Sequence, residues 1–89
     1  MHRAEATIVN KLGLHARPSA KITQAASQFR AEVWMTKAGR RINAKSIMGV
    51  MMLAASKGAT ITIEADGPDE VEAVDALRAL IAAGFDEEL

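Results

Sequence analysis

The chain has 89 residues, of which 49% are hydrophobic and 25% are charged. That length supports one domain, residues 1–89, built around a single core. Eleven basic and eleven acidic side chains give a formal net charge of zero, and there is no cysteine, so we expect no nucleic-acid binding, no disulfide and no thiolate metal site.

The sequence contains no obvious segment for membrane insertion. Its longest run of apolar residues and glycine, from 47 to 55, is about half of the ~20 residues that a spanning helix needs. The first five residues lack the apolar stretch of a signal peptide. We therefore expect a soluble, cytoplasmic protein.

The first half of the chain predicts a strand, a helix and a hairpin. Residues 5–9 are rich in β-branched side chains, which favour a strand. Apolar residues between 16 and 29 recur at helical spacing, with Pro18 in the first turn, where its missing N–H removes no hydrogen bond. Residues 32–37 and 40–43 then predict two strands joined by a two-residue turn.

The second half predicts a short helix, a strand and a long helix. Ser46 stands directly before the apolar residues 47–53, which is typical of an N-cap. Residues 59–65 alternate between apolar and polar side chains, as a half-buried strand does. The last helix follows a turn at 66–68, and its predicted core stripe is Val71, Val74, Leu77 and Ile81.

The predicted element order is β-α-β-β-α-β-α. Two long amphipathic helices each need a sheet face to cover, and the alternating last strand indicates that the other face is in water. We therefore predict an α+β fold, an open-faced two-layer sandwich with a four-stranded antiparallel sheet and three helices on one face. The last strand should lie between the first two, which is compatible with right-handed crossovers.

Residues 13–19 combine a histidine, an arginine and a helix-starting proline. Imidazole is a good nucleophile near neutral pH, and a helix start presents free N–H groups that stabilise an anion. Arg17 adds a fork-shaped donor that suits phosphate oxygens. These features suit a histidine that accepts a phosphoryl group, although isolated His-x-Arg pairs are common and do not specify this chemistry by themselves. The alternative is a surface histidine that happens to lie near an arginine.

Two motifs of this chain resemble the HPr family, the histidine-containing phosphocarriers of the bacterial phosphoenolpyruvate-dependent sugar phosphotransferase system. The motifs are Asn-Lys-Leu-Gly-Leu-His-Ala-Arg-Pro-Ser at 10–19 and Asn-Ala-Lys-Ser-Ile-Met-Gly-Val-Met at 43–51. The resemblance implies that enzyme I phosphorylates Nδ1 of His15 and that the group passes to enzyme IIA domains. It also implies that Arg17 and the backbone amides of Ala16 and Arg17 stabilise the phosphate, in a stoichiometric carrier that is not an enzyme and has no cofactor.

The same resemblance implies that Ser46 is the serine modified by HPr kinase/phosphorylase in bacteria that have this kinase. A phosphoserine there would place negative charge beside Ile47 and Met48 and should weaken docking more than folding. Val50 and Leu53 are the core candidates of this helix. Ile47, Met48 and Met51 should remain as a contact surface, where enzyme I and enzyme IIA dock in the family.

Two other functions remain open at this point. One is a regulatory carrier of the nitrogen-related branch of the phosphotransferase system, and the other is a non-catalytic module that binds a partner through the Met-rich helix. We expect a monomer without a metal site. We also expect His2, the Arg40–Arg41 pair and the acidic tail 86–88 to be solvated, and Trp34 to pack in the core or on the sheet face.

Overall fold

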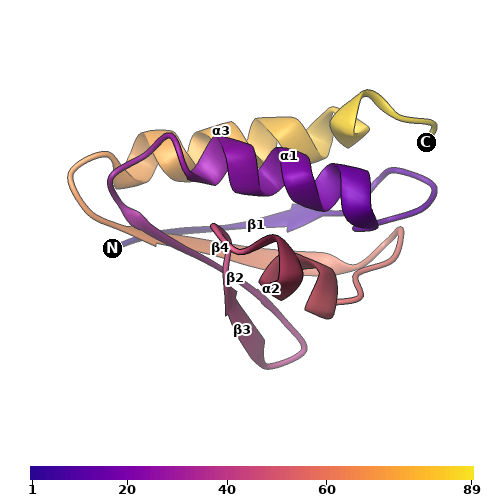
Figure 1. Ribbon diagram of the computed structural model, residues 1–89, viewed down its shortest axis with the longest axis horizontal. Helices are drawn as coiled ribbons and strands as arrows, with labels where there is room; N and C mark the ends of the chain where they lie inside the picture. Colours follow the sequence, from indigo (N-terminus) through magenta and orange to yellow (C-terminus); the bar gives the residue numbers. More distant parts are fainter.

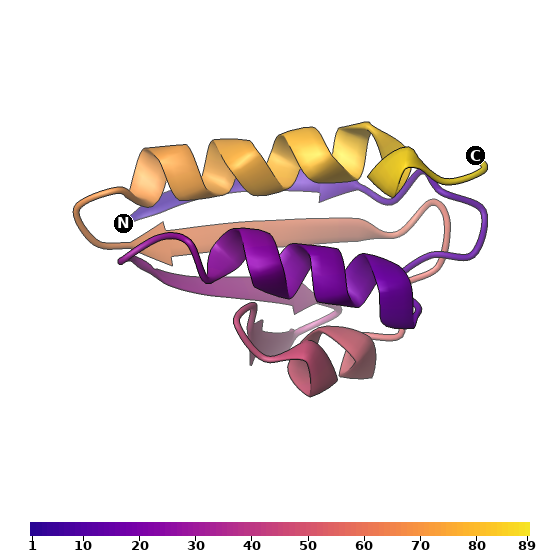
Figure 2. The ribbon, with the colours of Figure 1, turned by 45° about the horizontal axis from the view of Figure 1, so that its top comes forward.

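The computed structural model describes residues 1–89 as two layers, with the helices on one face of a sheet (Figure 1). The turned view separates the layers and leaves the other face of the sheet open (Figure 2). The predicted fold class is confirmed. The elements are β1 (His2–Thr7), α1 (Ala16–Ala26), β2 (Glu32–Lys37), β3 (Arg40–Asn43), α2 (Ile47–Met52), β4 (Thr60–Asp66), α3 (Glu70–Ala82) and the 3-10 turn η1 (Gly84–Asp86).

The sheet order is β1-β4-β2-β3, and each neighbouring pair is antiparallel. The last strand thus lies between the first two, as predicted. Ile63 of β4 faces Ala4 of β1 on one side and Met35 of β2 on the other. Because β4 has a partner on both sides, its backbone hydrogen bonds are satisfied along the centre of the sheet.

The core lies between the sheet and the helices. Its fully buried aliphatic side chains come from both layers and include Ile8, Ile22, Val33, Val50, Ile61, Ile63, Val74, Leu77 and Ile81. Each such side chain contributes about 1.5–3 kcal/mol relative to exposure in water. The alternation of β4 places its aliphatic residues in this core and its threonines towards solvent.

The open face of the sheet carries a charged cluster around Trp34. The guanidinium of Arg41 stacks over the indole ring at 4.1 Å from its centroid. Glu64 accepts a hydrogen bond from Arg3 at 3.0 Å and pairs with Arg41 at 3.4 Å. These arginines hold the pKa of Glu64 below its usual range, chiefly through the Arg3 bond. Trp34 therefore packs on the sheet face, and Arg41, although exposed as expected, also stacks on the indole ring and pairs with Glu64.

Three local predictions differ from the structure. The first strand begins at His2 and not at residue 5, because pairing with β4 extends to the His2–Ala65 pair. Helix α1 ends at Ala26 and the chain then turns. Val71 is 45% exposed, and Ala73 takes its place in the buried stripe of α3. For the first strand a tertiary contact, the pairing with β4, sets the outcome, and the local pattern does not contain it.

Candidate functional site

His15 stands at the start of α1 as the residue that precedes the first helical turn. Its backbone is extended, with φ −78° and ψ −169°, and its carbonyl accepts the first hydrogen bond from Ser19 N at 3.1 Å. The side chain does not cap the helix and is 37% exposed. Pro18 lies in the first turn, as predicted, and is buried. The helix start therefore presents the imidazole to solvent.

The loop before His15 packs against the segment that follows α2. Leu14 N donates to the carbonyl of Ala55 at 2.9 Å, and Gly13 is buried beside the same carbonyl with φ +66°. A Cβ atom on Gly13 would lie 2.3 Å from that oxygen. A glycine is required here by both the backbone angle and the close approach. This contact joins the His15 loop to the end of α2.

Glu87 of the C-terminal tail contacts His15 directly. Nε2 of His15 lies 3.0 Å from Oε1 of Glu87, and Asn10 Nδ2 donates to the same oxygen at 3.2 Å. The Glu87 side chain is only 17% exposed. The hydrogen bond from His15, followed by that from Asn10, holds the pKa of Glu87 below its usual range. The expectation of a solvated tail is therefore wrong at Glu87. No local sequence pattern could predict this contact, because the two residues are 72 positions apart.

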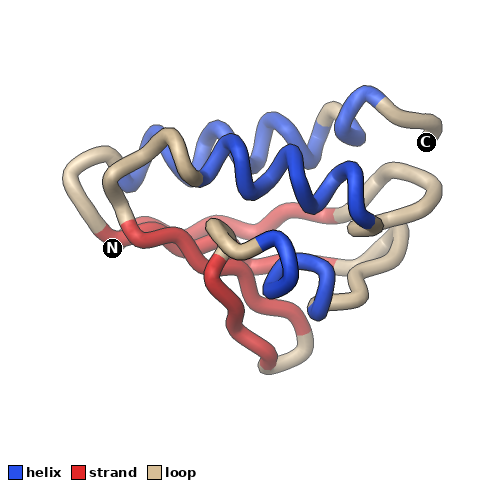
Figure 3. Tube along the Cα trace, viewed as in Figure 1, coloured by secondary structure: helices blue, strands red, loops and turns tan.

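The tail is anchored on both sides of Glu87. The Phe85 side chain is fully buried, and its carbonyl accepts a hydrogen bond from Lys21 Nζ at 2.6 Å. On the other side, Lys11 N donates to the carbonyl of Glu88 at 2.8 Å. The tail thus lies beside the loop that carries His15, at the same end of the molecule (Figure 3).

Arg17 lies in the first turn of α1 and is exposed, and it makes neither an ion pair nor a side-chain hydrogen bond. Together with His15 it borders a shallow cleft of about 420 Å³. Ala16 and Arg17 are the first two residues of α1. Their backbone N–H groups therefore have no partner within the helix. The residues that line the cleft are Lys11, Leu12, His15, Arg17, Asp86, Glu87 and Glu88.

Ser46 caps α2, as predicted, and its Oγ accepts a hydrogen bond from Gly49 N at 3.1 Å. Val50 and Leu53 are buried, whereas Met48 is 67% exposed. We call the exposed side chains of this helix the α2 apolar patch; they are Ile47, Met48, Met51 and Met52. The expected exposure of this helix is confirmed, while a docking role stays a prediction. Helix α2 lies beside α1 (Figures 1 and 2).

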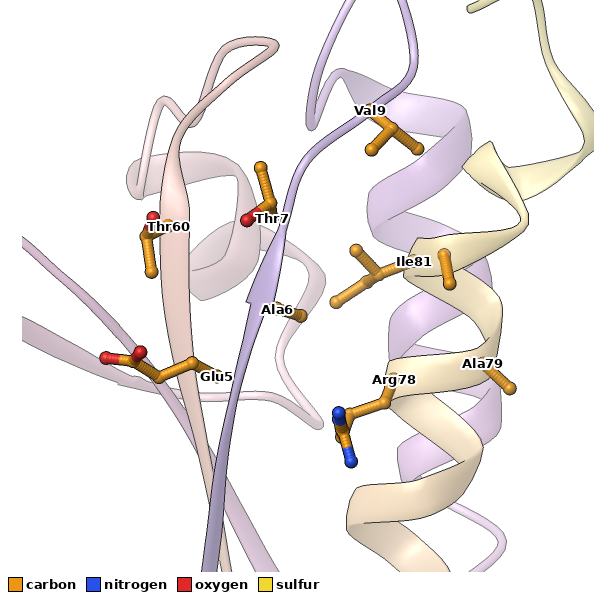
Figure 4. Close-up of a pocket in the computed structure, with 9 residues that line it drawn as sticks. Glu5, Ala6, Thr7, Val9, Thr60, Arg78, Ala79 and Ile81 are labelled. Carbon is orange, nitrogen blue, oxygen red and sulfur yellow. The ribbon is translucent and has the colours of Figure 1, made fainter.

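A larger groove, of about 610 Å³, lies between β1 and α3 and contains neither His15 nor Ser46. Ala6 and Ile81 are among the residues that line it (Figure 4). No group of three or more His, Cys, Asp or Glu side chains is arranged to hold a metal ion. None of the helices combines the length and the hydrophobicity needed to cross a membrane.

Known proteins resemble this chain in sequence and in structure. Residues 2–83 match the family model described as "PTS HPr component phosphorylation site". A phosphocarrier protein HPr from Cupriavidus necator is 62% identical over 87 residues, which cover 98% of each chain. The crystal structure of HPr-C-His from Thermoanaerobacter tengcongensis has a TM-score of 0.95 and 47% identity over 100% of both chains. An HPr dimer from the same organism has a TM-score of 0.76 and 46% identity, covering 96% of this chain and 98% of that one.

The open-faced sandwich, the exposed histidine at a helix start and these similarities define a phosphocarrier of the phosphotransferase system. The chain belongs to the HPr family. The family resemblance stated from the two motifs is thereby confirmed, and it implies interaction with enzymes of that system. Because one of the similar structures is a dimer, the expected monomer stays a prediction.

Proposed function

We propose that the protein accepts a phosphoryl group on Nδ1 of His15 from phospho-enzyme I and passes it to enzyme IIA domains, in sugar uptake and its regulation. The observation that carries this proposal is the contact between His15 Nε2 and the Glu87 carboxylate. An ionised carboxylate can only accept hydrogen bonds, so Nε2 carries the proton. The lone pair of a neutral imidazole is then on Nδ1, which is the nucleophile.

Arg17 and the helix start supply positive potential for the transferred group. The Arg17 guanidinium is free of ion pairs and borders the same cleft as His15. Guanidinium groups bind phosphate oxygens in a bidentate manner, and free amides at a helix start stabilise anions. In this proposal Arg17, with the amides of Ala16 and Arg17, stabilises the charge of the phosphoryl group during transfer.

The decisive experiment is phosphorylation by phosphoenolpyruvate and enzyme I. We expect acid-labile phosphate on the protein and its complete loss in His15→Ala. His2→Ala is the matched control, because His2 is the only other histidine, and this variant should keep the label. Arg17→Ala should slow transfer with the fold intact. An unlabelled parent protein would contradict the proposal and favour the partner-binding module, whereas labelling only by the nitrogen-branch enzyme I would favour that branch.

The α2 apolar patch is the proposed docking surface for enzyme I and enzyme IIA. Its side chains are exposed, and the Leu14–Ala55 hydrogen bond joins the end of this helix to the His15 loop. Met48→Ala should raise KM for enzyme I without changing stability, because Met48 has little burial to lose. Val71→Ala removes an exposed apolar side chain from α3 and should leave KM unchanged. An equal KM for enzyme I in both variants would contradict the proposal that the α2 apolar patch is the docking surface.

Ser46 is the proposed regulatory site for HPr kinase/phosphorylase. Its side chain is at the exposed start of α2, directly before the apolar patch. A phosphate there is compatible with the helix start but brings charge to a docking surface. A lysate of the source cells with ATP should give acid-stable label that Ser46→Ala lacks. Ser46→Asp should slow transfer relative to Ser46→Ala, and equal rates in the two variants would contradict a docking block.

A further inference from the structure

We propose that Glu87 is a positioning residue for phosphoryl transfer at His15. Its carboxylate holds the imidazole in the Nε2–H tautomer and neutralises the positive charge that the ring gains when Nδ1 is phosphorylated. The charge-neutralising role of Glu87 rests on the proposed function. The tautomer-holding role concerns the free protein and does not depend on any partner.

The Glu87 carboxylate is held in a defined position beside the ring. Its Oε1 is 3.0 Å from His15 Nε2 and accepts a second hydrogen bond from Asn10 Nδ2 at 3.2 Å. Asn10 is itself fully buried and also donates to the carbonyl of Gly13 at 2.9 Å. A buried amide that bonds both the His15 loop and Glu87 restricts how the carboxylate can move relative to the imidazole.

The backbone of the tail is shaped to bring Glu87 to this place. Phe85 and Asp86 both have φ +59°, in the left-handed region that non-glycine residues rarely adopt. Such a conformation persists only where surrounding contacts impose it. Here the buried Phe85 ring, the Lys21 bond to its carbonyl and the Lys11 bond to the Glu88 carbonyl impose it.

The chemistry of transfer gives the carboxylate a role beyond orientation. When Nδ1 attacks phosphorus, the P–N bond of the donor phosphohistidine breaks and its electron pair returns to the donor ring, while a P–N bond forms on His15. Nε2 keeps its proton throughout, so the ring of His15 becomes a phosphoimidazolium with one positive charge. Glu87 then forms an ion pair with that ring. Onward transfer to an acceptor reverses these changes and restores the neutral imidazole.

The other charged groups near the ring do not replace Glu87. Arg17, Lys11 and Lys21 are cations and oppose a positive ring. Glu88 borders the cleft, but its side chain is 78% exposed and lies 3.9 Å from Lys11 Nζ. Glu87 alone among these groups contacts the imidazole. Glu88 therefore provides a control with the same chemistry, one position further along the tail.

The experiment compares Glu87→Ala, Glu87→Gln and Glu88→Gln with the parent protein. ¹⁵N NMR of the unphosphorylated protein near neutral pH should show one neutral tautomer, Nε2–H, in the parent and in Glu88→Gln. Glu87→Ala should show a mixture of tautomers. Glu87→Gln should keep the parent tautomer, because an amide oxygen still accepts the hydrogen bond. Thermal unfolding followed by circular dichroism checks that each variant is folded.

Phosphoryl uptake from phospho-enzyme I tests the charge. Both Glu87 variants lose the negative charge that pairs with the phosphorylated ring, and both should lower kcat by about tenfold, the order expected when a charge-assisted hydrogen bond is lost or becomes neutral. KM should stay near the parent value, because Glu87 lies outside the α2 apolar patch. An unchanged tautomer and kcat in Glu87→Ala would overturn the proposal. If the parent shows the Nε2–H tautomer but takes up no phosphate, the proposed function fails, the charge role fails with it, and the tautomer assignment stands.

Discussion

Asn10 shows how a single side chain connects parts of the chain that are distant in sequence. Its amide joins the Gly13 carbonyl, in the loop before α1, to the Glu87 carboxylate of the C-terminal tail, which also contacts His15 Nε2. Its Oδ1 is buried without a partner, so the side chain serves as a donor at this site. The sequence placed Asn10 at the start of the 10–19 motif, after the first strand, but did not indicate its contact with the C-terminal tail.

Gly13→Ala should destabilise the protein by about 2 kcal/mol or more. The left-handed backbone alone costs an alanine roughly 1–2 kcal/mol, and its Cβ would lie 2.3 Å from the Ala55 oxygen. Urea unfolding measures the loss. Because relief of the clash would move the loop away from Ala55, we also expect slower phosphoryl uptake.

Gly58→Ala is the matched control for Gly13→Ala. Gly58 also has a positive φ, of 93°, but no atom lies within 4 Å of its added Cβ. Its loss of stability should be limited to the backbone cost of roughly 1–2 kcal/mol, without a change in transfer rate. Equal losses of stability in the two variants would show that the contact with Ala55 does not matter.

Helix α2 illustrates what a local pattern predicts well. The serine before an apolar run indicated the N-cap, and the spacing of Val50 and Leu53 separated buried from exposed positions. These features depend on neighbours within one or two turns, so the sequence contains them. The hairpin turn at Ala38-Gly39 was predicted for the same reason, and both residues have the positive φ of a type I′ turn.

The acidic residues before α3 illustrate what the sequence does not reveal. A pattern of Asp69, Glu70 and Glu72 indicates a helix start, yet the Asp69 side chain does not cap α3. It instead accepts hydrogen bonds from Arg30 N at 2.9 Å and Ala31 N at 2.8 Å. Glu87 is a second case, since its partner is at the other end of the chain. Both depend on which segments the fold brings together, which no local pattern specifies.

The Asp69 contact predicts a pH-dependent link between α3 and the start of β2. The backbone N–H of Arg30, then that of Ala31, lowers the pKa of Asp69 from its usual value. A carboxyl with a lowered folded pKa stabilises the fold fully above its unfolded pKa and loses this effect as pH falls through the folded pKa. Asp69→Asn should therefore lower the urea midpoint at neutral pH, and the gap should close in acid.

Asp75→Asn is the control, because Asp75 is exposed on the same helix and its carboxylate makes neither a side-chain hydrogen bond nor an ion pair. Its urea midpoint should follow that of the parent at both pH values. A gap between the parent and Asp69→Asn that persists in acid would mean that the lost charge is not the cause.

At the scale of the whole molecule, the two faces of the sheet have different roles. The helical face carries the proposed phosphorylation site, the α2 apolar patch and Ser46, whereas the open face carries the Trp34 cluster. The sheet is open and not closed into a barrel, so its two edge strands, β1 and β3, could pair with another chain. The oligomeric state depends on how these edges and the apolar patch are protected.

We expect a monomer, because each edge has a feature that discourages pairing. β3 has only four residues, and β1 presents the charged side chains of Arg3 and Glu5 to solvent. Sedimentation velocity over a range of concentrations should give one species with the mass of a single chain. Met48→Asp should sediment identically. If the parent forms a dimer and Met48→Asp does not, the α2 apolar patch is the self-association surface. If both form a dimer, pairing at the β1 edge is the remaining explanation.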